Sequence, residues 1–483
     1  MKLSELIRGL TVLETRGDMN VAVKSLTHDS RQAVPGALFV AVRGHQVDGH
    51  RFLPEVVRQG VAGLVVEQAI SDPIPQVVVA DARVALAQLA SCFYQEPSRK
   101  LRVIGITGTN GKTTLTYLLE SILQAAGRQV AVLGTINYRR SGKIIPAPNT
   151  TPDAADLQRH FRDMVAEGVT DVVMEVSSHA LDQGRVFGVH FDVAAFTNLT
   201  QDHLDYHPSL DHYFASKLRL FTHHLATSAK PKRLAVVNGD DPRSAVIAKN
   251  YPGTTLTVGF GGTCDLRPSS YELRPEGILA QVLLGGKVLD LESPLIGTFN
   301  LENILLAVGI AHGLDISDEA ILAGLKNLRG VPGRLERIDN QRGLQIFVDY
   351  AHTPDALTRV LQELRPLTKG RLLTVFGCGG DRDRSKRPLM GTAAARGSDQ
   401  VIVTSDNPRT EDPNQVISEI TQGMHGLGSF QVVPDREQAL STALQLAQSG
   451  DTLLVAGKGH EDYQIMGTQK VHFSDQEMLR KFL

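Results

Sequence analysis

Cysteine is scarce in this chain of 483 residues, and no apolar run is long enough to cross a membrane. Cys92, Cys264 and Cys378 lie far apart and form no CxxC pair, which excludes a disulfide framework and a thiolate metal site. A membrane helix needs about 18 consecutive apolar residues. The N-terminal segment carries charges from Glu5 onward, so it has no signal-peptide core. These absences predict a cytoplasmic protein.

The chain also lacks an excess of charge of either sign. Lys and Arg number 50 against 52 for Asp and Glu, a net charge of −2, so nothing in the composition points to nucleic acid or an anionic membrane as a partner. The length predicts about three domains. A polar joint at 95–100 and a glycine-rich joint at 330–334 place these domains at 1–98, 99–332 and 333–483.

Buried strands and amphipathic helices alternate through most of the sequence, which predicts an α/β fold with mostly parallel sheets. One stretch differs, because Gly285-Gly286 between two apolar runs (278–284 and 287–291) is typical of a β-hairpin. The expected strands are Leu38–Val42, Val61–Val66, Val77–Ala80, Val103–Thr107, Val130–Leu133, Val172–Val176, Val193–Phe196, Leu372–Phe376, Val401–Thr404 and Leu453–Ala456, and the expected helices are Arg83–Tyr94, Lys112–Ala126, Asn303–His312, Asp355–Leu364 and Arg436–Gln448.

The clearest functional motif is a glycine-rich turn between the strand that ends at Thr107 and the helix that follows. It is a shortened variant of the phosphate-binding P-loop, and a turn of this kind at a helix N-terminus presents free N–H groups to phosphate. Lys112 can reach the terminal phosphates and the Thr113 hydroxyl can bind Mg²⁺. The motif comprises Gly108, Thr109, Asn110, Gly111, Lys112, Thr113 and Thr114.

Three further features follow in the same region. Glu175 ends a buried strand, where open α/β sheets bind ligands, and its carboxylate can hold Mg²⁺. His203 lies in a loop with two histidines and two aspartates between 202 and 207, and Lys217 follows fourteen residues later. Each also fits a simpler interpretation: a solvated carboxylate, a polar loop and a lysine on an amphipathic helix.

In the last third of the chain, several loops after predicted strands carry polar or charged residues. The first contains Asp349, which can contact a nucleotide or cap a helix. The loops at 377–387, 404–409 and 456–461 carry basic groups that the sequence leaves unpaired, which indicates one shared anionic ligand. Cys378 has no partner pattern for a nucleophile and is interpreted as an inert small residue.

Taken in order, these motifs resemble those of the Mur ligase family, ATP-dependent amide-bond synthetases of peptidoglycan assembly. The resemblance covers nearly the whole chain, including the motifs at 27–31, 44–49, 406–409 and 457–461. It implies a smaller N-terminal α/β domain that binds a UDP-sugar, a central P-loop ATPase and a Rossmann-like C-terminal domain that binds an amino acid. The implied context is cell-wall biogenesis, and with it cell shape, cell division and the cell cycle.

The resemblance also implies a mechanism and roles for individual residues. ATP would convert a D-glutamyl carboxylate into an acyl phosphate, which the amine of the incoming amino acid attacks. Lys112, Glu175, His203 and Lys217 would be catalytic, with Lys217 carbamylated (N6-carboxylysine) and Thr113, Glu175, His203 and the carbamate as Mg²⁺ ligands. Beyond the loop, the nucleotide would meet Asn303, Arg334 and Asp349. UDP-N-acetylmuramoyl dipeptide would meet His28, Ser30, His45, Gln46, Val47, Asn149, Thr150, Thr151, Ser177, Gln183 and Arg185.

The acceptor that the resemblance implies is meso-diaminopimelate, which differs from lysine by one carboxylate. An arginine gives that group a planar, two-point partner, while Asp406 and Glu461 can accept from its ammonium. The implied acceptor residues are Arg382, Asp406, Asn407, Pro408, Arg409, Gly457 and Glu461.

Three alternatives remain open at this stage. The same type of ligase can use L-lysine, or the chain can be a folylpolyglutamate-synthetase-like ligase, although such a protein would lack the roughly 98 residues that precede the P-loop here. The third is a P-loop switch that hydrolyses nucleotide without joining substrates, which has no use for the anion-binding loops of the last domain. The sequence does not give the oligomeric state, and a monomer is the expectation.

Overall fold

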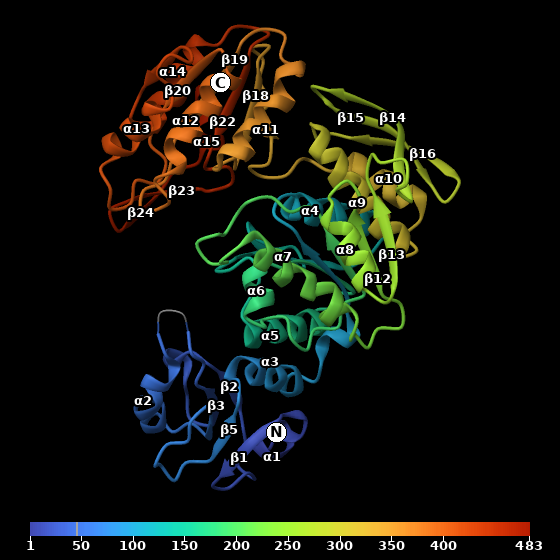
Figure 1. Cartoon of the computed structure of the whole chain (residues 1–483), viewed down its shortest axis with the longest axis vertical. Coiled ribbons are helices and arrows are strands. Elements are labelled where there is room, and N and C mark those ends of the chain that lie inside the picture. The colour runs from blue at the N-terminus through green and yellow to red at the C-terminus, as the bar shows by residue number, and fades with distance from the viewer. Residues whose placement is uncertain (45–46) are drawn as a thin grey trace. The chain divides into compact units, whose positions relative to one another are not determined.

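We describe the chain in a computed structural model covering residues 1–44 and 47–483. The chain divides into two compact units. The first comprises Met1–Arg267, Leu283–Lys287 and Asn303–Gly324, and the second comprises Pro268–Val282, Val288–Glu302 and Leu325–Leu483. The colour gradient of Figure 1 follows the chain from β1 to α15.

The N-terminal part of the first unit is a five-stranded sheet in the order β1-β5-β4-β3-β2. Strands β2 to β5 are parallel and β1 pairs antiparallel with β5. Alternate strand residues feed two apolar clusters, one with α1 and α3 and one with α2. The elements are α1 (Leu3–Leu6), β1 (Val12–Arg16), β2 (Ser25–Thr27), β3 (Ala37–Val40), α2 (Leu53–Arg58), β4 (Gly63–Val66), β5 (Gln76–Val79) and α3 (Ala82–Phe93).

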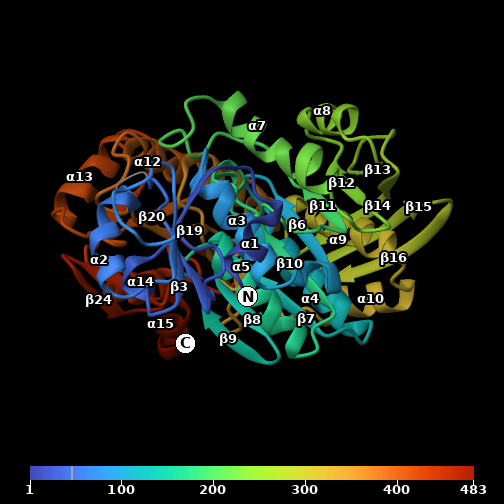
Figure 2. The ribbon, with the colours of Figure 1, turned by 90° about the horizontal axis from the view of Figure 1, so that it is seen from below.

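The central sheet of the first unit has parallel strands in the order β13-β12-β11-β6-β10-β7, and the antiparallel strands β8 and β9 extend it beyond β7. Helix α5 begins against α3, where Ala154 and Ala155 join the apolar cluster of the N-terminal sheet (Figure 2). The elements are β6 (Arg102–Thr107), α4 (Lys112–Ala125), β7 (Val130–Leu133), β8 (Asn137–Arg140), β9 (Lys143–Pro146), α5 (Ala154–Ala166), β10 (Asp171–Glu175), α6 (Ser178–Asp182), β11 (Val193–Phe196), α7 (Leu210–Arg219), β12 (Leu234–Asn238), α8 (Arg243–Asn250) and β13 (Thr254–Val258).

The predicted hairpin is confirmed as β15 and β16. Gly285 and Gly286 form the two-residue link, and both have positive φ angles, +57° and +83°, which glycine adopts at no steric cost. The elements of this stretch are β14 (Leu266–Arg274), β15 (Gly277–Leu284), β16 (Lys287–Ser293), α9 (Thr298–Gly313) and α10 (Asp318–Asn327).

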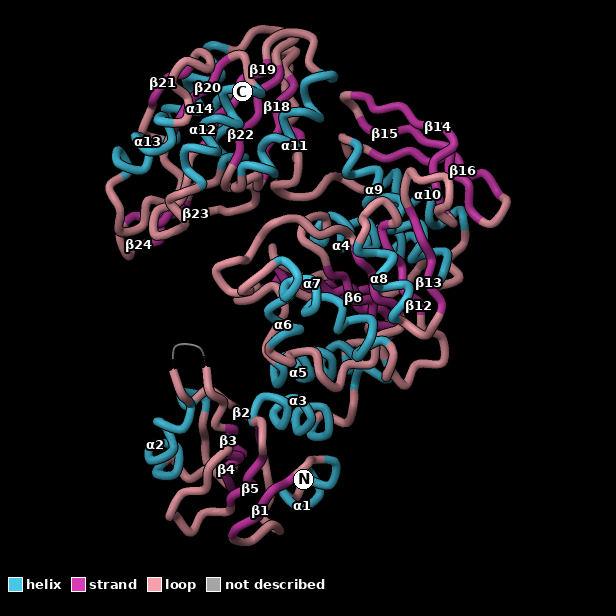
Figure 3. Tube along the Cα trace, viewed as in Figure 1, coloured by secondary structure: helices cyan, strands magenta, loops and turns pink. Residues whose placement is uncertain are grey.

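The C-terminal part of the second unit is a six-stranded sheet in the order β17-β18-β22-β19-β20-β21, parallel except for β17. Helices α11, α12 and α13 cover one face, and α14 and α15 cover the other. Figure 3 distinguishes the helices and strands of this part by colour. The elements are β17 (Glu336–Arg337), β18 (Gln345–Asp349), α11 (Pro354–Leu364), β19 (Leu372–Phe376), α12 (Lys386–Gly397), β20 (Gln400–Val403), α13 (Pro413–Gln422), β21 (Phe430–Val432), α14 (Arg436–Leu446), β22 (Thr452–Ala456), the antiparallel pair β23 (Tyr463–Met466) and β24 (Gln469–His472), and α15 (Asp475–Phe482).

The predicted α/β class is confirmed, and the predicted strands occur within two residues of their expected bounds. The largest difference lies in α9, which begins five residues before Asn303, at Thr298. Two antiparallel pairs, β8–β9 and β23–β24, were not predicted. Their strands are only four residues long and are half-buried (β8, β23) or mostly exposed (β9, β24), so they lack the apolar runs that identify buried strands.

Candidate active site

The phosphate-binding loop lies between β6 and α4, as predicted. Gly108 and Gly111 have φ angles of +147° and +86°, a region that favours glycine. A Cβ atom on Gly108 would come within 1.9 Å of Thr197 Oγ1, at the end of the neighbouring strand β11. Position 108 therefore needs glycine for space as well as for conformation. The loop leads directly into the N-terminus of α4, which has fourteen residues. That N-terminus favours an anion.

Lysine side chains approach this loop from two elements. The Lys112 ammonium donates to the carbonyl oxygens of Gly108 and Thr109 at 2.9 and 2.7 Å. Lys217, on α7, donates to the Gly108 oxygen at 2.7 Å and lies 4.2 Å from the centroid of the Tyr213 ring. Two amines thus share one backbone oxygen at the mouth of the phosphate loop.

Lys217 is buried, with 1% of its surface exposed. Burial, together with the charge of Lys112, lowers the pKa of Lys217 well below its usual value. This environment therefore disfavours the charged form of the Lys217 amine.

Thr113 and Glu175 are brought together below the loop. The Thr113 hydroxyl donates to Glu175 Oε1 at 2.9 Å, and the backbone and hydroxyl of Thr135 donate to the two carboxylate oxygens at 2.9 Å each. Glu175 is 1% exposed, and these three donors hold its carboxylate in one position. The neighbouring Thr114 is buried in α4.

A hydroxyl oxygen beside a carboxylate suits Mg²⁺, which prefers oxygen ligands and keeps several waters. Within residues 1–44 and 47–483, no three His, Cys, Asp or Glu side chains form a group that could hold a metal. Thr113 and Glu175 therefore fit a magnesium ion that takes its remaining ligands from phosphate oxygens, water or other side chains. The His203 ring lies 5.0 Å from that of His179 and 5.9 Å from that of Tyr213, centroid to centroid, and Tyr213 is also the ring beside Lys217.

A line of polar contacts leads from Glu175 toward the N-terminal sheet. Thr151 donates from its hydroxyl to the Glu175 backbone oxygen at 2.9 Å, and Arg185 donates to the Thr151 backbone oxygen at 3.1 Å. The same guanidinium lies 3.2 Å from Asp153 Oδ1, and Asp153 Oδ2 lies 3.9 Å from His28 Nε2. Five residues thus connect the phosphate loop region to the N-terminal sheet.

The remaining residues that the resemblance assigns to the dipeptide lie along this line. The Ser177 backbone donates to the Thr151 hydroxyl at 3.1 Å, and Gln183 accepts from Arg185 at 2.7 Å. The Thr150 hydroxyl lies 3.1 Å from that of Thr135, and the Asn149 carbonyl accepts from Tyr138. The structure brings together Asn149, Thr150, Thr151, Ser177, Gln183 and Arg185.

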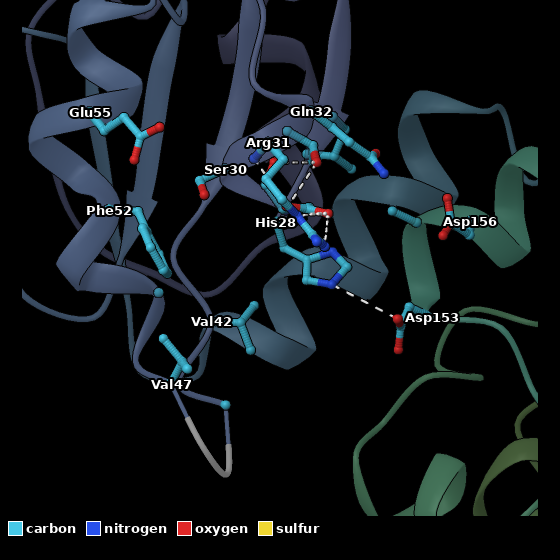
Figure 4. A pocket seen from close by; sticks show the side chains of 16 residues that line it. His28, Ser30, Arg31, Gln32, Val42, Val47, Phe52, Glu55, Asp153 and Asp156 are labelled. Atoms are coloured by element: carbon cyan, nitrogen blue, oxygen red, sulfur yellow. Dashed lines mark hydrogen bonds and ion pairs between the residues drawn. The ribbon is translucent and has the colours of Figure 1, made fainter. Parts of the chain in front are cut away.

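The line ends at a cavity of about 680 Å³ in the N-terminal region, shown in Figure 4. His28, Ser30 and Val47, which the sequence selected, all line it. His45 and Gln46, also selected, lie outside the described residues. Sequence reasoning missed lining residues that carry no motif signal of their own, namely Gln32, Val42, Phe52, Glu55, Asp153 and Asp156.

The expected nucleotide residues outside the loop occur in both units. In the first, Asn303 lies against the phosphate loop, because a Cβ on Gly111 would come 2.4 Å from its Oδ1. In the second, the Arg334 guanidinium lies 4.9 Å from the centroid of the Tyr350 ring. Asp349 accepts from the backbone nitrogens of residues 335 and 351 at 2.7 and 2.8 Å, and its burial raises its pKa although Arg334 lies nearby.

The second unit has its own cluster, where β18, β22, β19 and β20 end at one edge of the sheet. Asn407 donates to Glu461 Oε2 at 2.8 Å, and burial together with the nearby Asp406 raises the pKa of Glu461. Arg409 donates to the Gly380 oxygen at 2.6 Å. Gly457 has φ +109°, and a Cβ atom at this position would lie only 2.9 Å from Asp406 Oδ2. The absence of a side chain at Gly457 therefore keeps this space open. The acceptor residues that the sequence selected therefore converge from three loops.

One interpretation of these loops was wrong. Two of the basic groups that the sequence left unpaired are internal: Lys458 donates to the Tyr463 carbonyl at 2.5 Å, and Arg387 is held by Glu411 and Glu419. The partners of Arg387 lie 24 and 32 residues away, beyond what local inspection reveals. Arg384 is likewise paired with Glu419, and Lys386 donates to the His352 carbonyl. Arg382 is exposed, and Arg409 is half-buried with its guanidinium donating to the Gly380 oxygen, so the prediction of an anionic ligand now rests chiefly on these two.

A phosphate-binding loop on a mostly parallel sheet, beside a buried hydroxyl–carboxylate pair, defines a P-loop nucleotide-binding enzyme. Three family descriptions match the sequence: the Mur ligase family catalytic domain over 22–94, the Mur ligase middle domain over 106–311, and the Mur ligase glutamate ligase domain over 333–459. The chain belongs to the Mur ligase family.

Curated relatives match over their full length. The UDP-N-acetylmuramoyl-L-alanyl-D-glutamate–2,6-diaminopimelate ligase of Geobacter metallireducens is 47% identical over 496 residues, covering 99% of this chain and 97% of the relative. The protein of the same name from Geobacillus thermodenitrificans is 42% identical over 483 residues, covering 99% of each chain. A solved structure with that name has a TM-score of 0.74 at 32% identity, covering 100% of this chain and 98% of the other.

Folylpolyglutamate synthase of Mycobacterium tuberculosis, solved with ADP, is more distant. It has a TM-score of 0.64 at 20% identity and covers 78% of this chain and 91% of its own. This likeness shows a shared fold alone.

Proposed function

We propose that this chain is an ATP-dependent ligase that joins meso-diaminopimelate to UDP-N-acetylmuramoyl-L-alanyl-D-glutamate during peptidoglycan precursor synthesis. The observation that carries the proposal is the line of contacts from Glu175 through Thr151, Arg185 and Asp153 to the cavity at His28. An elongated substrate lying along it would have its nucleotide in the cavity and its carboxylate at the phosphate loop. Relatives that are 42–47% identical over nearly their full length carry this name.

The proposal assigns one task to each region of the chain. Residues 1–98 would bind the UDP-sugar, 99–332 would bind ATP, and 333–483 would bind the acceptor amino acid. We also propose a monomer that works in the cytoplasm, where ATP is available. Among the residues that the structure describes, no helix is long and apolar enough to span a membrane.

The chemistry at the phosphate loop begins with a problem of charge, because a substrate carboxylate must approach the anionic triphosphate. Lys112 and the N-terminus of α4 offset this repulsion and stabilise the charge of the transferring phosphoryl group. Thr113 and Glu175 would hold Mg²⁺, which screens the same charge. The carboxylate oxygen attacks the γ-phosphorus, ADP leaves, and the acyl phosphate forms. The acceptor amine then displaces phosphate.

We further propose that Lys217 carries a carbamate. Its neutral amine attacks CO₂, forming a C–N bond and releasing a proton, so a cationic side chain becomes an anionic one. The carbamate would then join His203 as a further Mg²⁺ ligand. Supporting this step are the burial of Lys217 and its place beside the Gly108 carbonyl, where a second ammonium next to Lys112 is unfavourable.

The acceptor would bind at the carboxyl edge of the C-terminal sheet. Arg409, with Arg382, would hold the terminal carboxylate that distinguishes diaminopimelate from lysine. Asp406 and Glu461 would accept from the ammonium at that end, and Asn407, Pro408 and Gly457 would shape the space between them.

The test is phosphate release from ATP in the presence of UDP-N-acetylmuramoyl-L-alanyl-D-glutamate. It is measured in four separate reactions: one without any acceptor, and one each with meso-diaminopimelate, L-lysine and ornithine. We expect release only with an acceptor and fastest with meso-diaminopimelate. Release that is independent of the acceptor contradicts a ligase, and a preference for lysine contradicts the assigned acceptor. Activity only with a folate and glutamate would favour the folylpolyglutamate alternative.

A further inference from the structure

A buried ionic cluster lies beneath the two loops that carry Arg382 and Arg409. At its centre is Arg387, near the start of α12, with none of its surface exposed. Its guanidinium binds Glu411 at two points, 2.8 and 2.9 Å, and Glu419 on α13 at 2.7 Å. It also donates to the Gly379 carbonyl at 3.3 Å. One cation therefore holds a helix, the loop after β19 and the loop after β20.

The same contacts tie the two loops to each other. Glu411 accepts from the Asp381 backbone nitrogen at 2.6 Å, and Asp381 accepts from the Thr410 hydroxyl at 2.7 Å. The Gly380 nitrogen donates to the Asn407 carbonyl at 2.9 Å. A Cβ on Gly380 would come 1.9 Å from the Pro408 oxygen, so the backbones are in close contact. The residues that carry these bonds are sequence neighbours of Arg382 and Arg409.

The loop after β20 adopts a backbone conformation that needs support at Arg409. Arg409 has φ +52°, in the left-handed region that residues other than Gly, Asn and Asp rarely adopt, and Asp381 in the neighbouring loop has the same angle, which an Asp adopts more readily. Such a conformation persists where surrounding contacts impose it. Here the Arg409 backbone is hydrogen-bonded to Ile465 and Gly467, and its guanidinium donates to the Gly380 oxygen. Glu411 holds the other loop at Asp381, and its pKa falls to about 2 because Arg387 donates to it.

We propose that Arg387 is a positioning residue for acceptor binding, acting through Glu411 to fix the spacing between Arg382 and Arg409. The inference rests on the proposed function and adds a residue to it. Since Arg387 is fully buried, it does not touch the acceptor, and its influence reaches the acceptor only through the loops. A buried ion pair is weak evidence for added stability but can impose one conformation.

The first test is Arg387→Lys, which keeps the charge and loses the two-point geometry. We expect the KM for meso-diaminopimelate to rise about 10- to 100-fold, because displacement of a positioned group by about 1 Å has effects of this size. KM for ATP and for the UDP-dipeptide should stay within about twofold of wild type. Glu411→Gln should give the same pattern and provides the test if Arg387→Lys does not fold.

Arg371→Lys is the matched control, because Arg371 also binds a carboxylate, Asp451, from two nitrogens, at 3.2 and 2.7 Å. That pair lies at the amino ends of β19 and β22, away from the acceptor loops. We expect it to leave the KM for meso-diaminopimelate unchanged. An equal rise in both variants means that loss of an ion pair weakens the domain in general, and overturns the proposal.

A double variant separates positioning from mere stability. If Arg387 acts through the loop of Arg409, adding Arg387→Lys to Arg409→Ala should lower kcat/KM by less than threefold further. A full multiplicative loss overturns the proposal. Failure of the proposed function is recognised separately, because wild type would then not release phosphate with meso-diaminopimelate.

Discussion

The phosphate loop and the acceptor cluster both lie at the carboxyl edge of a parallel sheet, but they are built in opposite ways. The phosphate loop is one continuous segment, 107–114, and its ligand groups are largely backbone N–H groups of a helix N-terminus. The acceptor cluster draws side chains from loops centred near 380, 408 and 459 and depends on the buried Arg387. The proposed triphosphate site is therefore local, whereas the proposed acceptor site is assembled from distant segments.

The largest effect should come from the local site. Lys112→Ala should lower kcat by roughly 10²- to 10³-fold, since phosphoryl transfer depends mainly on positioning and electrostatic stabilisation. Single-turnover phosphate release measures this, with thermal unfolding as the control for folding. A folded variant with near-normal turnover would contradict the role of Lys112 and weaken the contrast between the two sites.

The next largest effect should come from Lys217→Ala. It should lower kcat by about 10²-fold, because a proposed magnesium ligand beside the transferring phosphate is removed. Added acetate should restore part of the rate if the missing group is a carboxylate. The matched control is Lys217→Gln, which fills most of the space and should not respond to acetate. Absence of rescue, together with an unmodified amine in a crystal grown with nucleotide, would eliminate the carbamate.

Arg409→Ala tests the discriminating site. We expect roughly a 30-fold fall in kcat/KM with meso-diaminopimelate, about 2 kcal/mol, because a charge-assisted two-point contact is lost. L-lysine lacks the carboxylate and should be affected far less, so the preference between the two acceptors collapses. Equal slowing of both acceptors would mean that Arg409 does not select between them.

The smallest effect should come from the line between the loop and the N-terminal cavity. Arg185→Ala should raise the KM for the UDP-dipeptide about 10-fold with little change in kcat, because Arg185 contacts Asp153 and Thr151 away from the phosphate. Initial rates at saturating ATP measure this. A fall in kcat with unchanged KM would place Arg185 in the chemical step instead.

The same contrast explains what the sequence could reveal. The strand, glycine turn and helix around Lys112 are contiguous, so local periodicity and turn chemistry were enough to predict them. Thr113 and Glu175 lie 62 residues apart in the sequence. Thr113 lies in the first turn of the predicted helix after the phosphate loop, and Glu175 lies at the end of a predicted strand, so the α/β fold brings them together. The hairpin at Gly285-Gly286 was equally local.

Other residues gave no local signal. Asp153 contacts His28 and Arg185 only after α5 packs against α3, and nothing in the flanking sequence marks it. Arg387 looked like one more surface cation, because its partners Glu411 and Glu419 are 24 and 32 residues away. Long-range pairing of charges depends on the packing of the whole domain, and that is where sequence reasoning failed.

The contacts between the loops after β19 and β20 also bear on how the acceptor site can diverge among related sequences. Gly380 contacts Asn407 and Pro408, and Asp381 contacts Thr410 and Glu411, so the two segments are held in a fixed register. Inserting or deleting one residue in either segment would shift every one of these contacts. We therefore expect relatives with a different acceptor to keep both loop lengths and to differ by substitution at the positions of Arg382 and Arg409.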